Sequence, residues 1–143
     1  MLQVTKIFRF ETAHAINGYP GQCKNIHGHS YILHVTVAAK YLRDDYLPSS
    51  GFIIDFKELK NLVQTRVIKE FDHQLILSKE YIKNNVAAGN LKNLSVWEME
   101  PTAENILLYI KNVLHKELPE KVILNKLKLY ETSDSYAEWD NKD

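Results

Sequence analysis

Apolar and polar residues alternate along residues 4–14, which is the spacing of a β-strand with one face buried. A second strand is predicted over residues 29–39, because this stretch is rich in β-branched and aromatic residues. The residues between them, 15–28, are rich in turn-forming types and predict a loop. The buried face of the first strand is expected to carry Phe8, Phe10, Thr12 and His14.

Apolar positions three and four residues apart predict a helix over residues 56–70. Its buried stripe is expected to contain Phe56, Leu59, Leu62, Val63 and Val67. A second helix is predicted from Pro101-Thr102 to about residue 117, with Thr102 as its N-cap. Glu104 falls in the first turn, where a negative charge is favourable. The buried positions of this helix are expected to be Ile106, Ile110, Val113 and Leu114.

The remaining segments complete a mixed fold. Residues 78–93 are polar and contain Asn-Asn and Gly-Asn pairs, so they predict a long loop. Residues 94–99 predict a short strand, and residues 122–131 and 135–139 predict a closing hairpin. Two helices between two strand pairs indicate an α+β protein with an antiparallel four-stranded sheet.

Length and composition restrict the class of protein. A chain of 143 residues has the size of one domain, residues 1–143. Its 18 basic and 18 acidic residues balance, which argues against nucleic acid or an anionic membrane as a bulk partner. The single cysteine excludes an internal disulfide. No signal peptide or bilayer-spanning run is evident, so a cytoplasmic protein is expected.

Histidines at the junction of the first two strands indicate a metal site. Residues two apart on a strand point to the same side, so His27 and His29 project together. If the two strands pair as a hairpin, His14 arrives beside them. Three neutral imidazoles that leave one coordination position open are typical of catalytic zinc. His34 has the opposite parity and is expected to face away. The alternative is that these histidines are ordinary core or surface residues, since an isolated His-x-His pair is weak evidence.

Four other polar residues have both functional and ordinary interpretations. Cys23 has three interpretations: a fourth zinc ligand, a base near the metal, or a small buried apolar residue. Asp72-His73 is a helix-end dipeptide or a proton shuttle in which the carboxylate orients the imidazole. Glu131 is a solvated strand end, or a carboxylate that accepts two hydrogen bonds from an amidine-like edge.

The motifs FETAHAI, CKNIHGHSY, GFIIDF, FDH, PTAEN and YET follow one another over nearly the whole chain. In this order they resemble the 6-pyruvoyl-tetrahydropterin synthase / 6-carboxytetrahydropterin synthase family. The resemblance implies the tunnelling fold, in which trimeric barrels stack as a homohexamer with active sites at subunit interfaces. It also implies zinc as cofactor and 7,8-dihydroneopterin triphosphate as substrate.

The resemblance also assigns roles to individual residues. Zinc is implied to be held by three histidines, with an open or water-filled fourth position. A thiol removes a side-chain proton, a relay returns one, and a carboxylate anchors the amino-pyrimidine edge. By this resemblance the zinc ligands are His14, His27 and His29, and the thiol is that of Cys23. The relay consists of Asp72 and His73, and the anchoring carboxylate is Glu131. Thr102 and Glu104 are implied to line the pterin pocket.

Two products are compatible with these residues. The favoured one is 6-carboxy-5,6,7,8-tetrahydropterin, formed with acetaldehyde and triphosphate on the queuosine precursor pathway, because the chain looks like the compact bacterial type. The other is 6-pyruvoyl-tetrahydropterin, of the tetrahydrobiopterin-type pathway. A non-catalytic pterin-binding module is a further alternative. So is a structural zinc protein in which Cys23 closes the coordination sphere.

Overall fold

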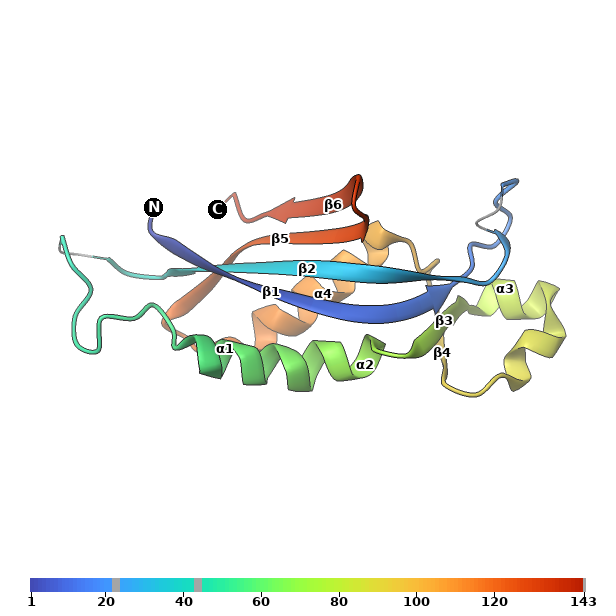
Figure 1. Cartoon of the computed structure of the whole chain (residues 1–143), viewed down its shortest axis with the longest axis horizontal. Coiled ribbons are helices and arrows are strands. Elements are labelled where there is room, and N and C mark those ends of the chain that lie inside the picture. The colour runs from blue at the N-terminus through green and yellow to red at the C-terminus, as the bar shows by residue number, and fades with distance from the viewer. Residues whose placement is uncertain (22–23, 43–44, 143) are drawn as a thin grey trace.

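The computed structural model describes residues 1–21, 24–42 and 45–142 (Figure 1). The strands are β1 (Gln3–His14), β2 (His27–Ala39), β3 (Gln74–Ser78), β4 (Leu94–Trp97), β5 (Val122–Thr132) and β6 (Ser135–Asp140). The helices are α1 (Phe56–Val63), α2 (Lys69–Phe71), α3 (Lys79–Asn84) and α4 (Ala103–Glu117). A π-helical segment, Gln64–Ile68, joins α1 to α2, and a 3₁₀ segment, Val86–Asn90, follows α3.

Six strands form one sheet in the order β4-β3-β1-β2-β5-β6. The central pairs β1–β2, β2–β5 and β5–β6 are antiparallel, as predicted, whereas β3 pairs in parallel with β1 and β4. The prediction of a four-stranded antiparallel sheet was therefore wrong at one edge. The strand β3 was missed because four of its five residues are buried, so it lacks the alternation that marks a half-exposed strand.

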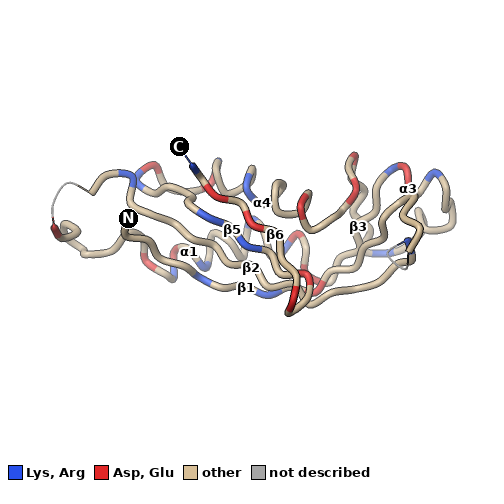
Figure 2. The backbone as a smooth tube through the Cα atoms, turned by 90° about the horizontal axis from the view of Figure 1, so that it is seen from above, with Lys and Arg blue, Asp and Glu red and all other residues tan. Residues whose placement is uncertain are grey.

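The helices α1 and α4 lie on the same side of the sheet (Figures 1 and 2). Between them and the strands, the core includes Phe10, Leu33, Leu59 and Ile110, all at most 1% exposed. Basic and acidic residues are interspersed along the molecule (Figure 2), consistent with its balanced charge. Within the described residues, no helix combines the length and the apolar character needed to cross a membrane.

The two predicted helices are present, with local differences in burial. In the first helix Leu59, Val63 and Val67 are buried as expected, but Phe56 is 49% exposed. It is the first residue after the N-cap Asp55, ahead of the turns that face the core. Leu62 in this helix, and Val113 in α4, are only half-buried.

Residues 78–93 were predicted as a long loop, and that prediction was wrong. The segment contains α3 and the 3₁₀ turn, and it starts at Ser78, whose hydroxyl accepts a hydrogen bond from the Tyr81 amide. Only Tyr81 of α3 is buried, so the helix shows too little apolar periodicity to be recognised in the sequence.

Candidate metal centre

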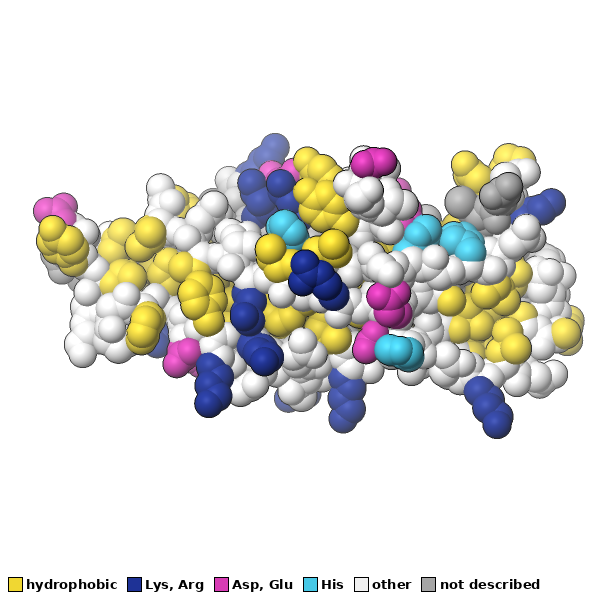
Figure 3. Space-filling model, in the orientation of Figure 1, with side chains coloured by type: hydrophobic (Ala, Val, Ile, Leu, Met, Phe, Trp, Pro, Cys, Tyr) yellow, Lys and Arg dark blue, Asp and Glu magenta, His cyan; other side chains and the backbone are white. Residues whose placement is uncertain are grey.

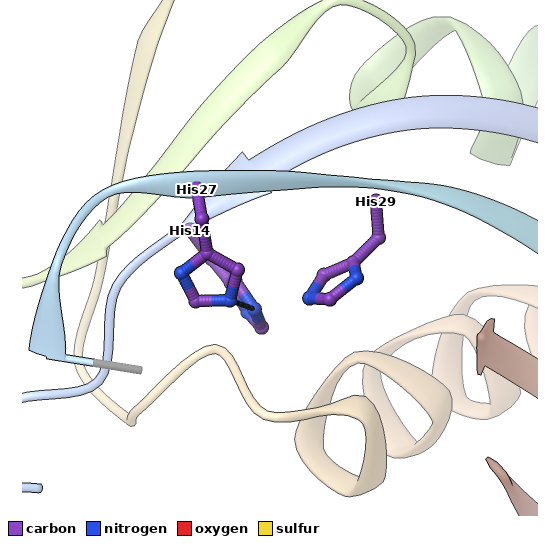
Figure 4. Close-up of side chains that lie close together, drawn as sticks. All are labelled: His14, His27 and His29. Carbon is purple, nitrogen blue, oxygen red and sulfur yellow. Dashed lines mark hydrogen bonds between the residues drawn. The ribbon is translucent and has the colours of Figure 1, made fainter. Parts of the chain in front are cut away.

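Three histidines converge at the end of the β1–β2 hairpin (Figure 4). In the ladder His14 lies opposite His27 and Thr12 opposite His29, which confirms the predicted hairpin geometry. The strand β2 begins at His27, two residues earlier than predicted, so that both of its histidines lie in the ladder. One ring nitrogen from each histidine lies within 4.8 Å of the others, a spacing that could hold a metal ion.

Backbone carbonyls fix the orientation of two of these rings. The His14 Nδ1 lies 2.6 Å from the carbonyl oxygen of Pro101, and the His27 Nδ1 lies 2.7 Å from that of Asn25. A carbonyl oxygen can only accept, so each Nδ1 carries a proton and donates it. In the neutral rings this leaves the Nε2 lone pairs free to bind a metal, the usual arrangement for metal-binding histidines.

The two free nitrogens also approach each other closely. The Nε2 atoms of His14 and His27 are 3.1 Å apart. Two bare lone pairs repel at that distance, so the arrangement requires a proton or a metal cation between them. Burial lowers the pKa of both His14 and His29, although the nearby Glu131 carboxylate opposes this effect. The lowered pKa favours the neutral imidazole, which is the form that binds a metal.

Glu131 reaches the histidines from β5. Its Oε1 atom lies 3.4 Å from the Nε2 of His14 and 3.4 Å from the Nε2 of His29. Residue 131 has the same parity on β5 as the buried Leu127 and Leu129, so its side chain extends the face that carries the histidines. A negative charge therefore lies directly against the cluster.

A cavity of about 310 Å³ adjoins the cluster, within the usual size range of small-molecule sites. Thr102 caps α4 by accepting a hydrogen bond from the Asn105 amide at 3.2 Å, as predicted, and this places the start of α4 at the cavity. The structure thus brings together the candidate substrate residues and one candidate metal ligand. The residues that line this cavity are His14, Ile16, Tyr19, Thr102, Ala103, Glu104 and Glu131.

Asp72 and His73 lie together, but away from the histidine cluster. The Asp72 Oδ1 is 3.1 Å from the His73 Nδ1, although adjacent residues seldom make such a contact. Here His73 adopts a left-handed backbone (φ 62°), which turns its side chain back toward Asp72. Two backbone contacts hold the turn: the Glu11 amide donates to Asp72 Oδ1, and the His73 amide donates to the Glu11 carbonyl.

The histidine of this dyad lies at a second cavity. His73 is 80% exposed and lines this cavity of about 460 Å³ together with Glu11, His29 and Ser30. The side chains of Glu11 and Ser30 are hydrogen-bonded across the β1–β2 ladder and alternate with those that point to the histidine cluster. Figure 3 shows acidic and histidine side chains next to one another on the face that it presents. The cavity that His14 and Glu131 line, in contrast, includes neither Asp72 nor His73 among its described residues.

Two further residues, His34 and Cys23, were considered as possible ligands in the sequence. His34 faces away from the cluster, as predicted, and its ring lies 5.4 Å from that of Tyr130. Cys23 lies outside the described residues.

Sequence reasoning missed Tyr31, two residues after His29 on the same face of β2. Its ring stacks on Phe10 at a centroid distance of 5.2 Å and meets the His29 ring edge-on at 5.5 Å. The side chain is fully buried, and its hydroxyl has no hydrogen-bond partner among the described residues. Burial, together with the charge of Glu131, raises the pKa of this hydroxyl, so it stays protonated. The sequence did carry a signal for Tyr31, since it lies two residues after His29 on the same strand and therefore points to the same face.

Replacing Tyr31 by phenylalanine should therefore stabilise the metal-free protein. An unsatisfied buried hydroxyl costs about 1–3 kcal/mol, so we expect Tyr31→Phe to raise the free energy of unfolding by about 1 kcal/mol. Urea denaturation in the presence of a chelator measures this. Tyr136→Phe on the exposed hairpin is the control and should change stability by less than about 0.5 kcal/mol. A loss of stability in Tyr31→Phe would show that the hydroxyl has a partner.

A family model described as 6-pyruvoyl tetrahydropterin synthase matches residues 3–142. The chain belongs to the 6-pyruvoyl tetrahydropterin synthase family. The resemblance drawn from the sequence motifs is thereby confirmed. Solved structures agree on the fold. The structure of 6-pyruvoyl tetrahydropterin synthase from Caenorhabditis elegans matches with a TM-score of 0.68 and 21% identity, covering 99% of this chain and 96% of that one.

Relatives in the 6-pyruvoyl tetrahydropterin synthase family carry more than one name. A Rickettsia typhi protein named 6-carboxy-5,6,7,8-tetrahydropterin synthase is 34% identical, covering 96% of this chain and 99% of that protein. A Haemophilus influenzae protein of the same name is 29% identical, covering 97% and 99%. A Pyrococcus furiosus protein, 30% identical with 87% and 85% covered, is named dihydroneopterin monophosphate aldolase.

Proposed function

We propose that this protein is a zinc-dependent 6-carboxy-5,6,7,8-tetrahydropterin synthase. It converts 7,8-dihydroneopterin triphosphate to 6-carboxy-5,6,7,8-tetrahydropterin, acetaldehyde and triphosphate. The observation that carries the proposal is the histidine cluster beside a cavity that Thr102, Glu104 and Glu131 also line. The named relatives at 29–34% identity over nearly the full chain support this reaction over others.

The donor set of the cluster fits zinc. His14, His27 and His29 offer three nitrogens, and three neutral nitrogen ligands are typical of catalytic zinc. The carbonyls of Pro101 and Asn25 hold two of the rings in the metal-binding tautomer. A zinc ion bound there would polarise the side-chain hydroxyls of the substrate and stabilise negative charge on them.

The cavity residues would hold the pterin ring. Two carboxylates line the cavity, and Glu131 lies against the histidines, next to where the substrate side chain reacts. Glu131 would accept hydrogen bonds from the amino-pyrimidine edge, with Thr102 and Glu104 lining the pocket around the ring. A carboxylate suits this edge because it can accept two parallel N–H bonds.

Cys23 supplies the base in this proposal. A neighbouring cation lowers the pKa of a thiol, so the thiolate is available near neutral pH. It takes a proton from a carbon of the substrate side chain, and triphosphate leaves by elimination. In the carboxy branch, hydration and carbon–carbon cleavage of a later intermediate then release acetaldehyde. Cys23 is chosen because its motif, Cys-x3-His-Gly-His, ends in two of the candidate ligands.

Asp72 and His73 form the proton relay, and they serve a neighbouring copy of the chain. The reason is that neither residue lines the cavity that His14, Thr102 and Glu131 form within one chain. An oligomer, for which we propose the hexamer of the tunnelling fold, would bring the relay of one chain to the histidine cluster of the next at a subunit interface. Oligomerisation also covers the edge strands β4 and β6, whose unpaired backbone groups would otherwise be exposed.

Mixing two inactive variants tests this shared site. His27→Ala removes a metal ligand and His73→Ala removes the relay. In co-expressed mixed oligomers, a site is intact when its histidine cluster comes from a His73→Ala chain and its relay comes from a His27→Ala chain. Random assembly gives about a quarter of such sites, so about a quarter of the wild-type rate should return.

The matched control is a mixed oligomer of His27→Ala chains and His29→Ala chains. Both substitutions damage the histidine cluster, so this mixture should recover no activity. No recovery in the first mixture would contradict a site that is shared between copies.

The alternative function is 6-pyruvoyl-tetrahydropterin synthesis. It begins with the same proton abstraction and loss of triphosphate, but it releases no acetaldehyde. Product analysis with 7,8-dihydroneopterin triphosphate therefore distinguishes the two enzymes. A protein that binds the pterin without any turnover would instead be a binding module.

A further inference from the structure

We propose that Asn93 is a positioning residue of the Asp72–His73 relay. Its side-chain amide holds the backbone of His73 in the conformation that brings the carboxylate and the imidazole together. The inference rests on the relay of the proposed function, and it adds to that relay a residue outside the sequence motifs that point to the family.

The relay depends on an uncommon backbone conformation. The Asp72 Oδ1 lies 3.1 Å from the His73 Nδ1, and this contact forms because His73 has a left-handed backbone with φ of 62°. For a residue other than glycine this conformation is unfavourable, and it persists only where neighbouring groups hold it. The His73 side chain is 80% exposed, so packing restrains the ring little and the backbone decides where the ring lies.

Asn93 holds this backbone on its C-terminal side. The Asn93 Nδ2 donates a hydrogen bond to the His73 carbonyl at 2.7 Å. Because a carbonyl oxygen can only accept, the nitrogen of the amide faces it. The Asn93 carbonyl in turn accepts a hydrogen bond from the Leu75 amide at 2.9 Å. Asn93 is thus bonded to the residues on both sides of Gln74, the first residue of β3.

The backbone of Asn93 suits this role. Its φ is 53°, and among the residues that the structure describes only Asn93 and His73 combine a positive φ with a side chain. Asparagine tolerates the left-handed region better than most residues. The first pair of the β3–β4 ladder is Leu75 with Leu94, so Asn93 stands directly before β4 and its side chain reaches the residue directly before β3.

The strand β1 holds the same turn on its N-terminal side. The Glu11 carbonyl accepts a hydrogen bond from the His73 amide at 2.6 Å, and the Asp72 Oδ1 accepts one from the Glu11 amide at 2.9 Å. Glu11 therefore fixes the peptide unit before His73, and Asn93 fixes the peptide unit after it. The angles φ and ψ of a residue are the rotations between these two units. Removing the Asn93 amide frees the second unit and lets the imidazole turn away from Asp72.

Asn93 acts through His73. Both residues line the cavity of about 460 Å³, but the amide nitrogen of Asn93 is bonded to the His73 carbonyl. Loss of this bond should therefore slow proton transfer and leave substrate binding unchanged. Since a misplacement of about 1 Å can slow a reaction about 100-fold, we expect kcat to fall by about 10- to 100-fold while KM stays the same.

Two substitutions of Asn93 separate the side chain from the backbone. Asn93→Gly adopts a positive φ without strain but has no amide. Asn93→Asp keeps the size and tolerates a positive φ, but its carboxylate cannot donate. Both should lower kcat for 7,8-dihydroneopterin triphosphate by about 10- to 100-fold and keep the wild-type KM and zinc content. The control is Asn125→Asp, which alters an amide that donates to the Gln3 side chain at the start of β1 and should keep the wild-type kcat.

Mixed oligomers give a second readout, which a general loss of stability would not produce. With His27→Ala chains, Asn93→Asp chains should recover about a quarter of the wild-type rate, because the intact sites take their relay from the His27→Ala chains. With His73→Ala chains, they should recover nothing beyond their own residual rate.

A wild-type kcat in Asn93→Gly would overturn the inference, because the amide would then not be needed. A raised KM with an unchanged kcat, or recovery in the mixture with His73→Ala, would overturn it as well. In those cases a low kcat in His73→Ala would leave the proposed relay standing. If His73→Ala itself kept the wild-type kcat, the relay would fail and the inference with it.

Discussion

Replacing His27 by alanine should abolish both metal binding and turnover. The ring supplies one of three nitrogens that lie within 4.8 Å of one another, and its Nδ1 is already held by the Asn25 carbonyl. Two remaining histidines cannot complete a set of three protein ligands, which catalytic zinc requires. We expect zinc content, measured by elemental analysis after dialysis, to fall from about one per chain to near zero. Turnover should fall by about 10³-fold or more.

The matched control is His34→Ala, on the same strand but on the opposite face of the sheet. His34 contacts Tyr130 and not the cluster, so the variant should keep its zinc. Stoichiometric zinc in His27→Ala, or loss of zinc in His34→Ala alone, would contradict the assigned site.

Replacing Cys23 by alanine should remove turnover while leaving the metal in place. A general base contributes about 10²- to 10⁴-fold to a rate, and a weakly acidic C–H proton depends strongly on one. We therefore expect a fall of about 10³-fold in the rate of triphosphate release, with zinc content equal to that of the wild type. Exchange of hydrogen between solvent and the side-chain carbons of the substrate should stop as well.

Zinc content separates the interpretations of Cys23. Loss of zinc in Cys23→Ala would make the thiol a ligand and favour the structural-zinc alternative. Retention of both zinc and full turnover would leave Cys23 without a chemical role. Cys23→Ser is a useful companion, because a hydroxyl of similar size is a far weaker base at neutral pH.

The sequence predicted the central β1–β2 hairpin because the side to which each residue of a strand points follows from its position along that strand. His27 and His29 project together from one strand, and the hairpin that brings His14 beside them needs only two alternating segments and a loop. The start of α4 was also predictable, since Pro101-Thr102 is a recognisable helix start.

The arrangement of the other site residues depends on tertiary structure and was less accessible. Glu131 reaches the histidines only because β5 pairs with β2, and alternation along a single strand does not show which strands pair. Asp72 and His73 meet only because His73 adopts a left-handed backbone, which is uncommon for a residue other than glycine. Their position beside β1 depends on β3, a strand that the sequence pattern did not reveal.

The products formed from 7,8-dihydroneopterin triphosphate test the proposed reaction directly. The purified, zinc-loaded protein is incubated with this substrate, and triphosphate, acetaldehyde and the pterin product are quantified together. His27→Ala serves as the blank. We expect one acetaldehyde and one triphosphate for each 6-carboxy-5,6,7,8-tetrahydropterin formed. Release of triphosphate without acetaldehyde would contradict the proposed reaction and identify 6-pyruvoyl-tetrahydropterin synthesis instead.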